Sequence, residues 1–153
     1  MGRGRAESSL IVDVNVLVYA VDSRSPHQRL CQQWLEAAFT GHGRVGFSWA
    51  TQLAFLRLTT HPRIVASPLK FKDAWELLDR WLDEPLAWTP TETPNHGRIL
   101  RDLTDRYELT GNLIPDAHLA ALAIGHGVPV VSCDSDFARF TEVDWINPNR
   151  PRP

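Results

Sequence analysis

The sequence has only two cysteines, Cys31 and Cys133, among its 153 residues. Two thiols are too few for the disulfide framework of a small secreted domain. The chain also lacks the paired Cys and His spacing that is typical of a zinc site. We therefore expect both thiols to be reduced and chemically inert, as is usual for a protein of the cytoplasm.

Long apolar runs are missing as well. No stretch approaches the roughly 18 apolar residues that a membrane-spanning helix requires. Residues 1–9 carry two arginines, but only Leu10, Ile11 and Val12 follow before the next charge, so they do not form a signal peptide. These absences predict a soluble, cytoplasmic protein in which residues 1–9 are a flexible leader.

An excess of either charge is absent too, because the formal net charge at pH 7 is -2. This balance excludes a protein that coats nucleic acid with a surface that is basic throughout, but it is compatible with local basic patches. With 43% hydrophobic and 22% charged residues, the composition is that of an ordinary globular protein. Without an internal repeat or a long linker, we expect one domain over residues 10–147 and a Pro-rich tail at 148–153.

The most informative stretch is residues 112–137. Apolar residues at helical spacing follow Pro115 and Asp116, which predicts a helix with an acid in its first turn. A short β-branched segment at 128–131 indicates a buried strand, and Asp134 and Asp136 come soon after it. The order of acid, helix, strand and acids is typical of a βαβ unit.

The N-terminal region shows the same pattern of a strand followed by an acid. Residues 10–12 predict a strand that ends in Asp13, and Asn15 is a candidate cap for the helix after it. The remaining patterns predict helices at 27–39, 49–60, 69–82 and 95–107 and strands at 44–48, 86–89 and 143–146. We therefore expect an α/β fold, a three-layer α/β/α domain with a mostly parallel central sheet.

In such a sheet, the carboxyl ends of the strands and the starts of the helices meet in one crevice. Asp13, Asp116 and Asp134 are thus expected to share a pocket, with Asp136 beside them. Two carboxylates about 4 Å apart repel by roughly 4 kcal/mol at an effective dielectric near 20, so the cluster favours protons or a cation. Aspartate oxygens suit Mg²⁺ or Mn²⁺, and such an ion supports phosphodiester hydrolysis.

Four segments of the chain form a pattern that is specific when they are taken together. They are residues 10–20 (LIVDVNVLVYA), 55–63 (FLRLTTHPR), 112–127 with the motif PDAHLAALA, and 132–137 with the motif DSDF. In this order they resemble PIN-domain ribonucleases, and most of all the VapC toxins of bacterial toxin-antitoxin pairs. The resemblance covers about residues 10–147 and implies a PIN-like α/β/α fold.

The resemblance also implies a function: a Mg²⁺- or Mn²⁺-dependent endoribonuclease that is the toxin of a type II, VapBC-like pair. It implies RNA as substrate, a homodimer, and a cognate antitoxin whose C-terminal segment covers the pocket. Trp49 and Trp81 are candidates for these protein interfaces, where aromatic residues are enriched. It implies a site of four acids, with Asp13, Asp116 and Asp134 as metal ligands and Asp136 as a catalytic support.

One position departs from the family pattern. The family usually has a glutamate one helical turn before an arginine such as Arg57, and this chain has Ala54 there. The missing carboxylate predicts weaker metal binding or a single tightly held ion, and it leaves open a catalytically idle PIN-fold module that binds RNA or protein. A phosphatase of a doubly wound fold usually needs a lysine late in its sheet. Such an enzyme is disfavoured here, because the only lysines, Lys70 and Lys72, lie in a mid-chain helix.

Residues around the acids have ordinary structural explanations. Asn15 and Asn112 are expected to cap or fix the loops beside the acids, and Ser132 is a candidate for a hydrogen bond to one of the acids. His118 lies only two residues from Asp116, so we expect it to point elsewhere, either solvated or packed. Three basic residues are candidates for contact with RNA phosphates: Arg57, His61 and Arg63.

Overall fold

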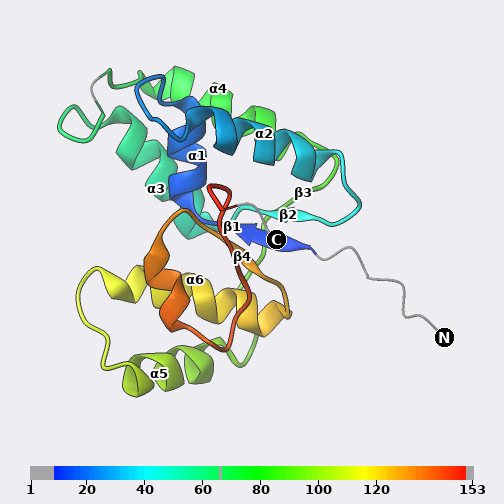
Figure 1. Cartoon of the computed structure of the whole chain (residues 1–153), viewed down its shortest axis with the longest axis vertical. Helices are drawn as coiled ribbons and strands as arrows, with labels where there is room; N and C mark the ends of the chain where they lie inside the picture. The colour runs from blue at the N-terminus through cyan, green and yellow to red at the C-terminus, as the bar shows by residue number, and fades with distance from the viewer. Residues whose placement is uncertain (1–8, 66, 151–153) are drawn as a thin grey trace.

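The computed structural model describes residues 9–65 and 67–150. The predicted leader, apart from Ser9, and the last three residues of the predicted tail lie outside the described residues. None of the helices in the described ranges is both long and apolar enough to cross a membrane. Helices and strands alternate along the chain in the α/β order that the sequence predicts (Figure 1).

Five short strands in the described part of the chain form one sheet in the order β3-β2-β1-β4-β5. Strand β1 lies at the centre, where Ile11 is in register with Gly46 on one side and Val130 on the other. Every pairing between the described strands is parallel, so the sheet is parallel throughout. The strands are β1 (Leu10–Val12), β2 (Val45–Gly46), β3 (Ala87–Trp88), β4 (Val130–Val131) and β5 (Trp145–Ile146).

Helices cover both faces of the sheet, which gives the three layers that the sequence predicts (Figure 1). One face carries α1 (Val14–Val21), α2 (Gln28–Phe39), α3 (Trp49–Thr60) and α4 (Phe71–Leu82). The other face carries α5 (His96–Arg106), α6 (Leu113–His126) and the 3-10 helix η1 (Ser135–Arg139).

Alternation along the central strands builds a core on each face. Val12 and Val131 pack into the core with α1 to α4, whereas their neighbours Ile11 and Val130 pack into the core with α6. Successive side chains of a strand point to opposite faces of the sheet. Because helices cover both faces, all four of these residues are fully buried. This two-sided burial explains why the strands are continuous β-branched runs rather than alternating patterns.

Helix α6 lies within residues 112–137, the most informative stretch of the sequence. It begins at Leu113, which places Pro115 and Asp116 in the first turn, where a proline costs no helical hydrogen bond. It ends at His126, because Gly127 adopts the left-handed conformation with φ 66° and donates its N–H back to the last turn. The parallel strand β4 follows and returns the chain to the sheet beside β1.

Candidate active site

Asp13 lies at the carboxyl end of β1 and caps the helix that follows. Its backbone is extended, and its Oδ1 accepts a hydrogen bond of 2.7 Å from the N–H of Val14, the first residue of α1. The sequence predicted Asn15 as the cap, and this prediction was wrong. Because Asp13 is the N-cap, α1 begins at Val14, and Asn15 lies inside the helix.

Asn15 and Ser132 connect the ends of the two central strands. The hydroxyl of Ser132 donates to Asp13 Oδ2 at 2.7 Å, and the amide of Asn15 donates to the same oxygen at 3.1 Å. Asn15 Oδ1 accepts from the backbone N–H of Cys133, and Ser132 Oγ accepts from that of Asp134, both at 3.0 Å. Asn15 therefore fixes the loop after β4, and Ser132 hydrogen-bonds an acid, as the sequence predicted. The side chain of Asn112, in contrast, makes no capping hydrogen bond at the start of α6.

Three further acids face one another at this edge of the sheet. Asp116 comes from the first turn of α6, and Asp134 and Asp136 come from the start of η1. One carboxylate oxygen of each lies within 4.8 Å of the others, a spacing that can hold a metal ion. Asp134 also accepts the N–H of Asp136 at 2.8 Å, which orients the two acids of η1.

Asp13 lies beside this group of three acids. It lines a pocket together with Asp116, but its carboxylate is already engaged by Val14, Ser132 and Asn15. Burial raises the pKa of Asp13; the hydrogen bonds from Ser132 and Val14 oppose this rise, and the charge of Asp134 adds to it. A carboxylate has about four acceptor positions, so one remains for a further ligand.

Asp116 also has a strongly raised pKa. Desolvation by burial raises its pKa from 3.8 to about 7, with added repulsion from Asp13, Asp134 and Asp136. The guanidinium of Arg139, which lies 3.4 Å from Asp136, opposes this rise only in part. The crowded negative charge and the all-oxygen donor set both fit a hard divalent cation.

A pocket of about 160 Å³ opens between α3 and α6 beside the acids. Asp116 lines it together with Ala54 and Arg57, so Ala54 lies at the site without supplying a carboxylate. Arg57 brings a positive charge to the same place. The two other candidates for contact with RNA phosphates, His61 and Arg63, follow the end of α3 and are not among the described residues that line this pocket.

His118 also lines the pocket, although the sequence predicted that it would point away from the acids. Its ring is packed against His96, as the sequence predicted, but its place in the wall of the pocket was not predicted. The Nδ1 atom of His118 lies 3.0 Å from Nε2 of His96 on α5. The two histidines are 22 residues apart on separate helices, so no local sequence pattern signals this contact.

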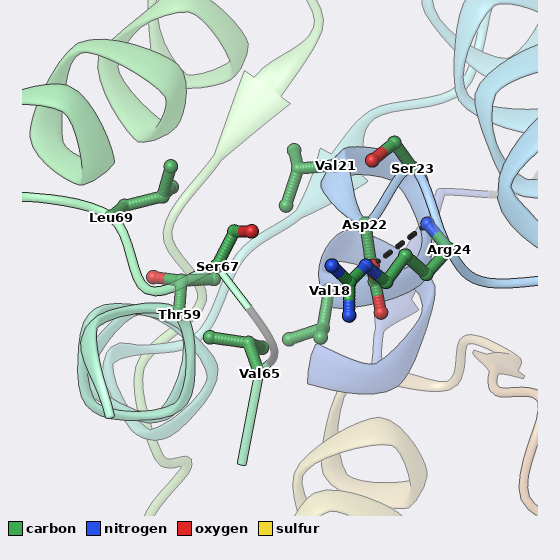
Figure 2. A pocket seen from close by; sticks show the side chains of 9 residues that line it. All are labelled: Val18, Val21, Asp22, Ser23, Arg24, Thr59, Val65, Ser67 and Leu69. Atoms are coloured by element: carbon green, nitrogen blue, oxygen red, sulfur yellow. Dashed lines mark hydrogen bonds between the residues drawn. The ribbon is translucent and has the colours of Figure 1, made fainter. Parts of the chain in front are cut away.

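A second cavity, of about 200 Å³, lies between the end of α1 and the segments next to α3 and α4 (Figure 2). Val18 and Val21 form part of its apolar wall. Arg24 donates its backbone N–H to Asp22 Oδ1 at 3.0 Å at its rim. None of the predicted site acids is among the described residues that line it, so this cavity is separate from the acidic site.

The two thiols lie next to the residues that hold Asp13, because Cys133 directly follows Ser132 and donates its N–H to Asn15. Cys31 of α2 is fully buried, Cys133 is partly exposed, and their Sγ atoms are 3.6 Å apart. Both are free thiols. Their chemical inertness stays a prediction.

Comparison with known proteins places the chain in a family. A family model for the PIN domain matches residues 10–143. Ribonuclease VapC37 of Mycobacterium tuberculosis is 43% identical over 138 residues, which is 90% of this chain and 96% of that protein. Ribonuclease VapC33 of the same species is 35% identical over 141 residues, 92% of this chain and 99% of that protein.

Solved structures share the fold. VapBC2 from Rickettsia felis, bound to a DNA fragment from its promoter, matches with a TM-score of 0.66 and 18% identity over 90% of this chain and 97% of that chain. VapBC-1 from nontypeable Haemophilus influenzae matches with a TM-score of 0.65 and 14% identity over 92% and 98%. The family model and the two mycobacterial relatives show that this chain belongs to the PIN-domain family and, within it, to the VapC ribonucleases.

Proposed function

We propose that this chain is an endoribonuclease that hydrolyses RNA with the help of Mg²⁺ or Mn²⁺ and acts as the toxin of a toxin-antitoxin pair. The observation that carries the proposal is the group of three facing carboxylates at the edge of the parallel sheet. The similarity to two mycobacterial ribonucleases supports RNA as the substrate. The all-oxygen donor set supports a hard cation.

The acids have different roles in this proposal. A bound cation would neutralise charge on the scissile phosphate. Asp134 is assigned to the attacking water, from which its free oxygen accepts a hydrogen bond or a proton. Ser132 and Asn15 hold the carboxylate of Asp13 in a single orientation at the edge of the site. The proposed ligands of the cation are Asp116, Asp134, Asp136 and, from the edge of the group, Asp13.

Arg57 is the proposed contact for an RNA phosphate. It lies in the last turn of α3 and lines the pocket beside Asp116. A guanidinium there can bind phosphate oxygens through two parallel hydrogen bonds and thereby position the strand. Ala54 adds no carboxylate on this wall, so we propose that one cation, rather than two, is tightly held.

Two exposed apolar pairs support protein partners. Trp49 and Leu53 lie one turn apart on α3 and are 57% and 61% exposed, and Phe71 and Trp75 on α4 are 63% and 42% exposed. Trp81, the other predicted interface residue, instead packs against the core. One structure with a similar fold is a toxin-antitoxin complex from Klebsiella pneumoniae. We propose a cognate antitoxin and a second copy of the chain as the partners of these surfaces.

The test of the enzymatic proposal is cleavage of total RNA by the purified, antitoxin-free protein. The reactions contain Mg²⁺, Mn²⁺ or EDTA, and they include Asp116→Asn and the control Asp102→Asn, which changes an exposed acid of α5. We expect discrete fragments that require metal, persist in the control and vanish in Asp116→Asn. Folded protein that cleaves nothing under any condition would instead favour an idle RNA- or protein-binding module, which the carboxylate missing at Ala54 makes the main alternative.

A further inference from the structure

Two histidines without a role in the proposed chemistry form a connected pair at the pocket. His118 of α6 lines the pocket with Asp116 and Arg57. Its Nδ1 lies 3.0 Å from Nε2 of His96, and the two rings meet edge to face with centroids 4.8 Å apart. Its Nε2 lies 3.8 Å from a carboxylate oxygen of Glu92. The ring of His118 is therefore held by His96 on one side and faces the carboxylate of Glu92 on the other.

These contacts indicate which ring nitrogen of each histidine carries a proton. Nδ1 of His96 is buried without a hydrogen-bond partner among the described residues. A proton there would be a buried donor without an acceptor, which proteins rarely tolerate. His96 therefore carries its proton on Nε2 and donates it to Nδ1 of His118. Desolvation by burial is the main cause that lowers the pKa of His96, and it favours this neutral form.

The same assignment leaves His118 with its proton on Nε2. The opposite tautomer would turn a bare nitrogen toward the carboxylate of Glu92, so that two acceptors would face each other. At 3.8 Å, Glu92 is too distant to use the Nε2 proton in a hydrogen bond. The side chain of His118 is 27% exposed, so this donor is accessible from solvent. A nitrogen that carries a proton cannot bind a metal ion, but it can bind an anion.

We propose that His118 is a substrate-binding residue that donates a hydrogen bond from Nε2 to a phosphate oxygen of the RNA, and that His96 positions it. This inference rests on the proposed ribonuclease function. The acids of the site repel phosphates, so a bound strand needs donors on the walls around them. Arg57 supplies one donor from α3, and His118 supplies a second from α6, so a strand in the pocket is held from two walls.

The experiment uses amide side chains to separate the two ring nitrogens. In His118→Gln the amide reaches about as far as Nε2, whereas in His118→Asn it reaches only about as far as Nδ1. In the same way, His96→Gln keeps a donor toward His118, and His96→Phe removes it. The control is His126→Asn, at the far end of α6, where the ring contacts the carbonyl of Thr91. All variants are first compared by thermal unfolding.

The measurement is kcat and KM on an RNA oligonucleotide that spans a site cleaved by the parent protein in total RNA. We expect His118→Asn and His96→Phe to raise KM about tenfold and to leave kcat within about twofold, because a hydrogen bond to a charged phosphate is lost equally from the ground and transition states. His118→Gln and His96→Gln should stay within about threefold of the parent KM, and His126→Asn should match the parent.

Two results would overturn the inference while the proposed function stands. One is a parent-like KM in His118→Asn. The other is an equal loss in the Asn and Gln variants together with a lower melting temperature, because a purely structural role does not distinguish the two amides. If the folded parent cleaves no RNA at all, both the proposed function and the inference are wrong.

Discussion

Asp13 and Asp116 lie at the same pocket, but their carboxylates differ in the hydrogen bonds that they accept. The carboxylate of Asp13 accepts hydrogen bonds from Val14, Ser132 and Asn15. Among the described residues, the carboxylate of Asp116 accepts no hydrogen bond and meets three other acids, which adds to the effect of burial in raising its pKa to about 7. Hydrogen bonds from the protein therefore offset part of the cost of burying the charge of Asp13. For Asp116 this compensation is left to the proposed cation. Each prediction below changes one side of this contrast.

The largest expected effect comes from adding the cation. Mg²⁺ or Mn²⁺ at about 100 times its Kd should stabilise the folded parent by about 2.7 kcal/mol, because the ion binds the folded state alone. Thermal unfolding with and without the ion measures this gain, and Ca²⁺ serves as a second hard cation. The exposed-acid variant Asp102→Asn should gain as much as the parent. An equal gain in Asp116→Asn would show that the ion binds elsewhere.

A second prediction concerns pH in the absence of metal. The pKa of Asp116 is about 7 in the folded protein, against 3.8 for an ordinary exposed aspartate, so the folded state binds the extra proton between these pH values. Its contribution to stability is fully present below about pH 4 and is lost as the pH rises through 7. We expect a loss of about 2 kcal/mol, roughly half the full linkage value because the carboxyl is partly open to solvent.

Urea unfolding in EDTA at several pH values measures this loss. Asp116→Asn removes the titrating group, so its stability should depend less on pH than that of the parent and should exceed the parent's near pH 7.5. An identical pH dependence in the two proteins would contradict the assignment of this raised pKa to Asp116.

The network around Asp13 carries a third prediction. Ser132→Ala removes a buried donor to Asp13 and an acceptor for the N–H of Asp134. We expect a loss of about 1 to 2 kcal/mol in the free energy of unfolding, with or without metal. Ser135→Ala, an exposed serine of η1, is the matched control and should change little. A Ser132→Ala protein as stable as the parent would show that this network does not stabilise the fold.

The smallest expected effect comes from Ala54→Glu, which returns to the pocket the carboxylate that the family usually has. It should tighten Mg²⁺ binding by about tenfold, since one more oxygen ligand faces the same space. It should also lower metal-free stability slightly, because it adds another negative charge beside Asp116. Calorimetric titration measures the affinity, and Gln33→Glu on α2 adds the same charge away from the pocket. No difference between the two variants would contradict the placement of Ala54 at the site.

The sequence predicts the parts of this molecule that depend on local patterns. Short β-branched runs followed by acids predict a parallel sheet with Asp13, Asp116 and Asp134 at one edge, and the structure has this arrangement. The sequence predicted that Asn15 fixes a loop but could not identify its partners, because Ser132 and Cys133 lie 117 and 118 residues away, directly after the other central strand. The position of His118 was missed because the shape of the pocket depends on how α3, α5 and α6 pack.

Local sequence patterns also do not reveal which of the acids matter most for metal binding. The sequence ranked Asp13 above Asp136 as a metal ligand, whereas the structure groups Asp136 with Asp116 and Asp134 and surrounds Asp13 with donors. The difference arises from the 3-10 conformation of η1, in which Asp134 caps the helix and the next acid turns toward α6. Which of the four acids bind the ion therefore stays a prediction for experiment.

The most direct measurement of the metal site is calorimetric titration of Mn²⁺ into the metal-free parent, Asp116→Asn and Asp102→Asn. We predict one tightly bound ion per chain in the parent and in Asp102→Asn, and loss of that binding in Asp116→Asn. Binding to Asp116→Asn with the parent's stoichiometry and affinity would contradict the claim that the facing acids form a metal site.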